Sequence, residues 1–210
     1  MPWKKKGPYR KKRSNYRRRP NFKRSIMSTV NKMAETKYYT NTLTNTEITG
    51  FNTSSSVVSN LIELSTISAG DNHNNRDGYK VFFKWLTMRM QTQTYYSKHL
   101  MRVLIVKSLH GPLSASDFPT TITERLGNHM YKHKVLRDKV YTLHSNAENG
   151  YISKYLPINV KLNSGCYWDS TSGTSDVRGG IYVMFINDTG AGSGTPQEIT
   201  VDYGLSYKDI

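Results

Sequence analysis

Cysteine is nearly absent from this chain of 210 residues, which holds only Cys166. A single thiol excludes an intrachain disulfide and a metal site built on several cysteines. Stability must therefore come from packing or from assembly of several copies. Cys166 lies beside Tyr167 and Trp168 in a turn-rich segment, where we interpret it as a buried small apolar residue. A reactive or intersubunit thiol is the alternative.

Long hydrophobic runs are also missing. The longest are Val103–Val106 and Ile181–Ile186, far below the roughly 20 residues that a membrane-spanning helix needs. The N-terminal segment is charged and lacks the apolar stretch of about 7–15 residues found in secretion signals. We therefore expect no membrane insertion, no signal peptide and synthesis inside the cell.

Acidic residues are absent from the start of the chain, where the first acid is Glu35. The first 24 residues hold twelve of the 30 Lys and Arg, so the remaining 186 residues carry 18 basic and all 15 acidic residues. Of the total charge of +15, the rest of the chain thus contributes only +3. The twelve cations are Lys4, Lys5, Lys6, Arg10, Lys11, Lys12, Arg13, Arg17, Arg18, Arg19, Lys23 and Arg24.

A segment of this kind cannot fold alone, because like charges repel and its few aromatic residues offer little apolar area against the ordering entropy. We predict a disordered basic arm over residues 1–36 that binds nucleic acid, and one folded domain over residues 37–210. The aromatics Trp3, Tyr9, Tyr16 and Phe22 lie between the cations. Stacking on unpaired bases contributes about 1–3 kcal/mol each, which favours single-stranded nucleic acid.

The cluster Lys4–Arg13 also predicts a nuclear import signal, since short basic runs serve either purpose. The same residues would carry import and nucleic-acid binding, and the alternative is a tail that only aids solubility. An arm bound to a membrane surface is disfavoured because the segment has no amphipathic periodicity.

The folded part is rich in Thr, Ser, Asn, Tyr and Val and poor in Ala, Glu and Leu. This composition is typical of strands and turns, and short apolar runs separated by turn residues indicate an all-β sandwich or barrel. The predicted strands are Tyr38–Ile48, Val57–Ser65, Tyr79–Thr94, His99–Lys107, Lys134–Leu143, Tyr151–Leu162, Gly180–Asn187 and Glu198–Tyr207.

The strand Tyr79–Thr94 has two halves whose alternation does not match. Phe83 and Trp85 share one face in the first half, whereas Leu86 and its alternate neighbours are apolar in the second half. A register change or bulge near Trp85 would reconcile the two. After Lys84, the polar face consists of Thr87, Arg89, Gln91 and Gln93.

The connections Ala69–Gly78, Ser164–Gly180 and Asn187–Pro196 are predicted as exposed loops, because Gly, Ser, Asn and Asp are frequent in them. Ser114 or Ser116 is a candidate cap for a short helical turn. Residues Ser25–Lys37 could form a short amphipathic helical turn.

Catalytic and cofactor motifs are sparse. His129 and His133 would share a face of a helix, but only Glu124 lies nearby as a third ligand and Gly127 weakens a helix there, so structural roles are favoured. There is no G-x-S-x-G motif and no phosphate-binding loop, since the glycine-rich stretch Gly190–Gly194 lacks the lysine and the following helix. We predict that the protein is not an enzyme and has no cofactor.

Six aspartates lie in segments predicted as loops. Turn and cap roles are the favoured interpretation, and calcium bound between neighbouring subunits is the alternative. These residues are Asp71, Asp77, Asp117, Asp169, Asp176 and Asp188.

Three features carry a resemblance to a known family: the opening MPWKKKGPYRKKRSNYRRRP, the size of the folded part, and the Arg76-Asp77-Gly78 turn before the strand Tyr79–Thr94. In these the chain resembles the circovirus-like capsid proteins of small circular single-stranded DNA viruses, and it is also similar to satellite-virus coat proteins.

The resemblance implies an eight-stranded antiparallel jelly roll, a β-sandwich that forms the shell domain, with copies closing into a T=1 icosahedral shell of about 60 subunits. The arm would line the interior, where twelve charges per copy would offset roughly 700 phosphates. Implied partners are further copies of the chain, the single-stranded genome, a host import receptor and a cell-surface receptor bound by outer loops. The implied location is the virion, with assembly in the host nucleus or cytoplasm.

A cellular nucleic-acid-binding β-barrel module with a basic tail is the alternative function. Such a module should carry cations and aromatics on one face of its body, whereas a capsid protein concentrates charge in the arm. The small charge of the folded part favours the capsid, and the fifteen tyrosines suit protein interfaces. Lys132, Lys134, Arg137 and Lys139 form a basic cluster that leaves body contacts to nucleic acid open.

Overall fold

A computed structural model describes residues 35–48, 61–94, 98–119, 122–123, 131–144, 152–169, 178–187 and 197–210. The predicted arm lies outside these ranges apart from its last two residues, and so does most of the segment predicted as an amphipathic turn. The strands of the described part are β1 (Lys37–Ile48), β2 (Leu61–Glu63), β3 (Lys80–Thr94), β4 (Lys98–Ser108), β5 (His133–His144), β6 (Ile152–Tyr167), β7 (Ile181–Asn187) and β8 (Gln197–Asp209).

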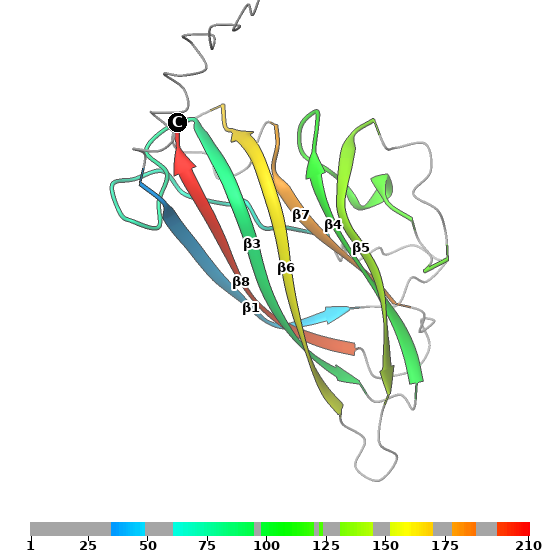
Figure 1. Cartoon of the computed structure of the whole chain (residues 1–210). Helices are drawn as coiled ribbons and strands as arrows, with labels where there is room; N and C mark the ends of the chain where they lie inside the picture. The colour runs from blue at the N-terminus through cyan, green and yellow to red at the C-terminus, as the bar shows by residue number, and fades with distance from the viewer. Residues whose placement is uncertain are drawn as a thin grey trace, which may run out of the picture. The chain divides into compact units, whose positions relative to one another are not determined.

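The strands form two four-stranded sheets, one in the order β1-β8-β3-β6 and the other in the order β2-β7-β4-β5. Every strand pairing within these sheets is antiparallel. In Figure 1 the first four lie side by side, with β7, β4 and β5 next to them. Because consecutive strands alternate between the sheets for much of the chain, the fold is an eight-stranded jelly roll, as predicted. All eight strands were predicted in the right order, six of them with ends within one or two residues.

The predicted bulge in β3 is confirmed. The register of β3 shifts between Phe83 and Trp85 against both β6 and β8. Phe83 is buried before the bulge and Leu86 after it, whereas Trp85 is about half exposed. Relative to β8, β3 has one extra residue here, which keeps the apolar side chains of both halves of β3 in the core and turns Trp85 outward. Relative to β6, the extra residue lies in β6.

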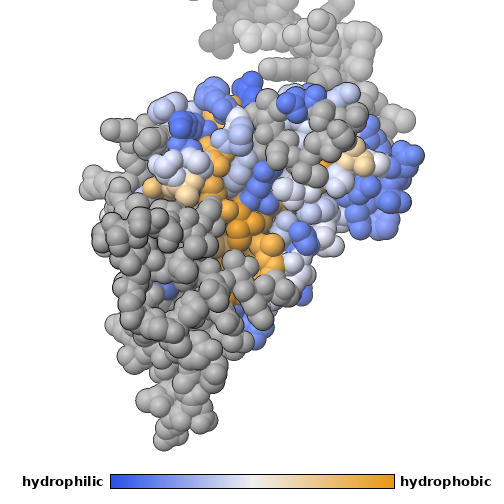
Figure 2. Space-filling model, turned by 180° about the vertical axis from the view of Figure 1, so that it is seen from behind, coloured by the Kyte–Doolittle hydropathy of each residue, from blue (hydrophilic) through white to orange (hydrophobic). Residues whose placement is uncertain are grey.

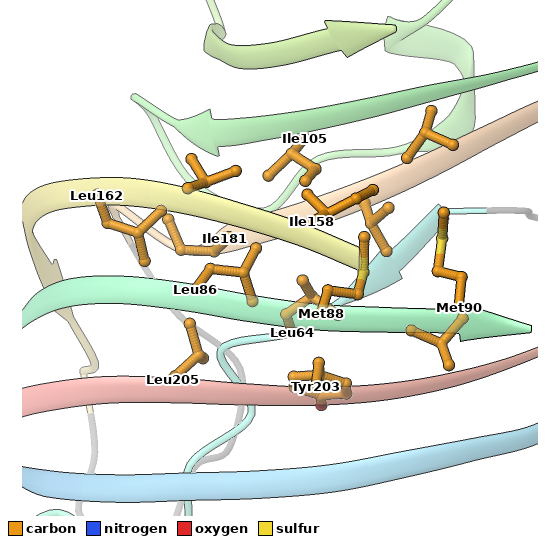
Figure 3. Packing of buried hydrophobic residues seen from close by; sticks show 14 of the residues in the cluster. Leu64, Leu86, Met88, Met90, Ile105, Ile158, Leu162, Ile181, Tyr203 and Leu205 are labelled. Carbon is orange, nitrogen blue, oxygen red and sulfur yellow. The ribbon is translucent and has the colours of Figure 1, made fainter. Parts of the chain in front are cut away.

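The main core lies between the sheets, where side chains from both layers interdigitate (Figure 3). Leu86 and Met88 of β3 and Ile158 of β6 meet Ile105 of β4 and Ile181 of β7. These five side chains are at most 1 % exposed. Each such burial contributes about 1.5–3 kcal/mol, which makes this layer the main source of stability.

A second apolar cluster covers the other side of the β2-β7-β4-β5 sheet. The connection after β4 contributes Leu113 and Phe118, which pack against Leu104, Tyr182 and neighbouring residues. The strand β7 is consequently buried along its whole length. Figure 2 shows a group of apolar residues near the middle of the face seen from behind, with hydrophilic residues on one side of it.

Three sequence predictions need correction or refinement. β6 runs on to Tyr167, into a segment predicted as loop, because Ser164 and Gly165 pair with β3 and Cys166 is fully buried. The loop Ala69–Gly78 is not exposed throughout, since Arg76 is fully buried. The described part of the second strand is shorter than predicted, and residues 57–60 lie outside the described ranges.

The predicted helical turn is present as a 3-10 turn, η1 (Ala115–Asp117), with Ser114 at its N-terminal cap. Asp117 Oδ2 accepts hydrogen bonds from the backbone N–H of Ser114 at 3.0 Å and from its hydroxyl at 3.2 Å. The described residues contain no helix long and apolar enough to cross a membrane.

Candidate nucleic-acid interface

The twelve cations predicted to bind nucleic acid lie outside the described residues, so their role stays a prediction. The structure does describe the surface beside the place where the arm joins the domain. This surface is the face of the β1-β8-β3-β6 sheet that points away from the core, here called the outer face.

Strand alternation decides which side chains reach the outer face. On β3 the residues Thr87, Arg89 and Gln91 are exposed while the residues between them are buried, as the predicted polar face requires. Gln93 was part of the same prediction, but its side chain is outside the described set. On β6 the exposed positions include Tyr155 and Lys161, which alternate with core residues.

The pairing register arranges these side chains in rows across the sheet. The first row runs from Tyr38 through Ser206 and Trp85 to Lys161.

The next row places Thr40, Gly204, Thr87 and Asn159 side by side, and a third contains Asp202 next to Arg89. Residues from four distant parts of the sequence therefore form one surface.

Aromatic side chains are prominent on this surface. Tyr38 is 62 % exposed, Trp85 48 % and Tyr155 58 %. Lys161 Nζ lies 6.0 Å from the centre of the Trp85 ring, and Lys80 Nζ lies 5.2 Å from the Tyr167 ring. Cations held over aromatic rings form a surface that suits bases and phosphates together.

The described side chains of the outer face carry a net positive charge. Among its described side chains Asp202 is the one acid. The cations at outward positions are Lys80, Lys84, Arg89, Lys161 and Lys208.

Two of these cations lie where the arm joins the domain. Lys84 Nζ donates a hydrogen bond of 2.7 Å to Oγ1 of Thr36, the residue before β1. Partial desolvation and the positive charge of Lys208 lower the pKa of Lys84. A bound anion would relieve the repulsion between these two lysines.

A hollow of about 510 Å³ lies over β1, β8 and β3. Tyr38 and Trp85 stand on its two sides, and Gly204 and Ser206 of the intervening strand line it. A Cβ on Gly204 would meet its nearest neighbour, Thr40 Cγ2, at 3.6 Å, so the hollow exists because β8 carries small residues at this point.

The basic cluster predicted from Lys132 to Lys139, at the start of β5, is less open to a ligand than the outer face. Lys132 Nζ binds Asp117 Oδ1 at 2.6 Å, and Lys139 Nζ lies 4.9 Å from the ring of Tyr141. Lys134 is exposed, and Arg137 is half-buried. The cluster therefore does not form one open basic patch.

Two of the aspartates considered for metal binding, Asp77 and Asp117, have other roles in the structure. Asp77 accepts from Lys37 Nζ at 2.6 Å, and the same nitrogen lies 2.9 Å from Asp209. Asp117 forms an ion pair with Lys132 and accepts a hydrogen bond from the backbone N–H of Ser114, the cap of η1. No three His, Cys, Asp or Glu side chains come together as a metal site in the described ranges, and Asp176 and Asp188 lie outside them. A calcium site between subunits stays a prediction.

His133 has a structural place, as predicted. It is 2 % exposed and its ring stacks on Phe118 at 5.0 Å between centroids. His129 lies outside the described residues. Nearby, Arg102 donates to both carboxylate oxygens of Asp138, at 2.8 and 2.7 Å, and to the carbonyl of Ile122 at 3.1 Å. These contacts hold the connection after β4 against the sheet.

Cys166 is fully buried, which confirms the interpretation made from the sequence. The residues that sequence reasoning missed are those of the hollow. The alternation in β3 identified Thr87 and Arg89, but the presence of Tyr38, Gly204 and Lys161 beside them depends on the strand order.

No family model matches the chain, and no curated protein sequence does. Among solved structures it is similar to the capsid of a nodavirus of the giant freshwater prawn Macrobrachium rosenbergii, seen in a semi-empty virus-like particle by cryo-electron microscopy. The two share 8 % sequence identity at a TM-score of 0.32, over 100 % of this chain and 95 % of the other. The jelly-roll assignment rests on the strand order of this chain itself.

Proposed function

We propose that this protein is a viral capsid protein whose copies assemble into a small icosahedral shell and package a single-stranded genome through the basic arm. The observation that carries the proposal is a jelly roll in the order β1-β8-β3-β6 and β2-β7-β4-β5, preceded by a basic arm whose first 24 residues hold twelve cations and no acid. The fold supplies a rigid shell unit, and the arm supplies charge for a polyanion.

Surface composition supports assembly. Several large aromatics are exposed in the described domain, among them Tyr131 at 63 % and Tyr79 at 53 %. Tyrosine contributes contact area at low entropic cost, and it is enriched where proteins meet. In this proposal part of the exposed aromatic surface becomes buried between copies in a shell of about 60 subunits.

The finer parts of the proposal concern the host. A circovirus-like capsid would place the protein in the virion, with Lys4–Arg13 directing it to the nucleus before assembly. The partners are then other copies of the chain, the viral genome, an import receptor and a cell-surface receptor. No catalytic step is part of this function.

The test is to express the full chain, separate it by sedimentation, and image the fast fraction by negative-stain microscopy. The absorbance ratio at 260 and 280 nm is recorded before and after nuclease treatment. The proposal predicts uniform spheres whose nucleic acid resists nuclease. Particles that contain no nucleic acid at low salt would contradict the packaging role of the arm.

One observation favours the second candidate, a cellular nucleic-acid-binding module. The outer face carries cations and aromatics on one side of the domain, which is the pattern expected of such a module. The total of +3 for residues 25–210 does not show this pattern, because it adds together the charges of all surfaces. A chain that stays monomeric at all salt concentrations but binds single strands would establish this alternative.

A further inference from the structure

We infer that the outer face of the β1-β8-β3-β6 sheet is a second site for single-stranded nucleic acid, in which an unpaired base inserts between Tyr38 and Trp85. This inference rests on the proposed binding of single-stranded nucleic acid. It adds a site on the folded domain to the one proposed for the arm.

The register gives the slot its width. Tyr38 pairs with Ser206, and Ser206 pairs with Trp85, so the two aromatics are two strands apart. Strands lie about 4.7–4.9 Å apart, which separates the two Cα atoms by roughly 9–10 Å. A flat ring held between two others needs roughly 7–8 Å between the outer rings, at contact distances of about 3.5–4.0 Å. The two side chains can therefore hold one base between them.

The slot between Tyr38 and Trp85 is deep because the residues of β8 beneath it are small. Ser206 and Gly204 lie between the two aromatics and in the next row. They line the hollow of about 510 Å³ together with Tyr38 and Trp85. A large side chain on β8 at either position would fill this space, so small residues here keep it open.

Charge complementarity selects the occupant. Lys84 and Lys208 lie at the arm end of the slot, and their mutual repulsion favours an anion. Lys161 follows Trp85 in its row, and Arg89 lies four residues further along β3. A strand whose base fills the slot thus has cations on both sides for its phosphates. Neutral aromatic ligands would use the rings alone.

The position of the slot links it to the arm. Thr36, which accepts the hydrogen bond from Lys84, is the last residue of the predicted arm. Eleven residues separate Arg24 from Thr36 in the sequence, so nucleic acid bound by residues 4–24, as proposed, is tethered through the chain to the domain that carries the slot. The tether raises the effective concentration of the nucleic acid at the second site.

The test uses the full chain and an oligothymidylate of about 16 nucleotides carrying 5-iodouracil. After irradiation, mass spectrometry locates the cross-linked peptide, and affinity is measured over a range of salt concentrations. The inference predicts a cross-link to the peptide that contains Trp85. It also predicts that Trp85→Ala lowers affinity about tenfold while the salt slope stays unchanged, because stacking releases no counterions.

Gly204→Val is the sharper variant. Valine favours a strand and a Cβ at this position makes ordinary contacts, so the fold should be kept or stabilised. The added methyl groups narrow the slot, so affinity should fall as it does for Trp85→Ala. A role of Gly204 in stability alone would not produce this pattern. Tyr131→Ala and Lys134→Gln, at exposed residues outside the outer face, serve as controls and should bind normally.

Cross-links confined to residues 1–36, with unchanged affinity for both variants, would overturn the inference. Loss of particles without loss of affinity would assign the face to contacts between copies and would overturn it as well. Sedimentation of the same samples separates this result from failure of the capsid proposal. If the chain forms no particles but still cross-links at Trp85, the second site is supported and the capsid proposal is rejected.

Discussion

The guanidinium carbon of Arg76 lies 4.6 Å from the centre of the Trp168 ring, and both side chains are buried. Arg76 Nε donates to the carbonyl of Ile67 at 3.0 Å, and Nη1 donates to that of Gly78. The guanidinium of Arg76 thus connects the turn before β3 to Trp168, which follows β6. The Arg76-Asp77-Gly78 turn noted in the sequence therefore contains a structural arginine.

Arg76→Lys should lower the free energy of unfolding by about 3 kcal/mol, because lysine cannot stack and donate to both carbonyls at once. Urea unfolding followed by circular dichroism measures the change. Arg178→Lys is the matched control, since Arg178 is exposed, and it should stay within about 0.5 kcal/mol of the parent. Equal stability of the two variants would show that Arg76 does not fasten the turn.

Gly179 is a second position where the fold depends on one residue. Its φ is +88°, and a Cβ there would lie 2.2 Å from the carbonyl oxygen of Gly165, which belongs to the backbone of β6. Gly179→Ala should therefore cost at least about 2 kcal/mol of unfolding free energy, measured by urea denaturation. Gly78→Ala is the control, since its Cβ would meet nothing within 4 Å. If Gly179→Ala were as mild as the control, the close approach of residue 179 to β6 would be wrong.

Asp117 links stability to pH. Burial alone would raise its pKa, but the hydrogen bonds from Lys132 and Ser114 outweigh burial and leave the pKa of Asp117 below its usual value. A carboxylate whose folded pKa is depressed stabilises the fold above its unfolded pKa of about 3.9. That contribution is lost as pH falls through the folded pKa.

Asp117→Asn should therefore be less stable than the parent at pH 7, and the difference should shrink as pH falls below about 4. Urea midpoints of both proteins between neutral and acidic pH measure this. A difference that stays constant with pH would mean that the charge of Asp117 is not what stabilises the cap of η1.

Salt dependence tests the arm. If all twelve cations engage a single strand, the logarithm of affinity should fall with the logarithm of salt concentration with a slope of about −8. Replacing the twelve by glutamine should remove most of this slope. A slope that survives the replacement would place the main electrostatic contacts on the folded domain.

The fold could be predicted from the sequence because its signals are local. Alternation of apolar residues located the strands, and the mismatch between Phe83 and Leu86 located the bulge that turns Trp85 outward. The extension of β6 to Tyr167 was missed, because Ser164 and Gly165 look like turn residues until β3 pairs with them. At these residues, the pairing with β3 outweighs the local preference for a turn.

The outer face was beyond sequence reasoning for a different reason. Tyr38, Gly204 and Trp85 come from three separate segments and become neighbours only through the strand order β1-β8-β3. Charge totals concealed the basic face, since the total for the folded part adds together the charges of all its surfaces. The burial of Arg76 was likewise hidden, because its partner Trp168 is distant in sequence.

The mass of the assembled protein tests the central claim most directly. Mass photometry of the purified full chain, after nuclease treatment at high salt to remove nucleic acid, counts subunits in each particle. With a chain of 24.1 kDa, a shell of 60 copies has a mass of about 1.4 MDa, and a single narrow peak there is the predicted result. A protein that remains a monomer or small oligomer over all salt and protein concentrations tested would contradict the capsid function.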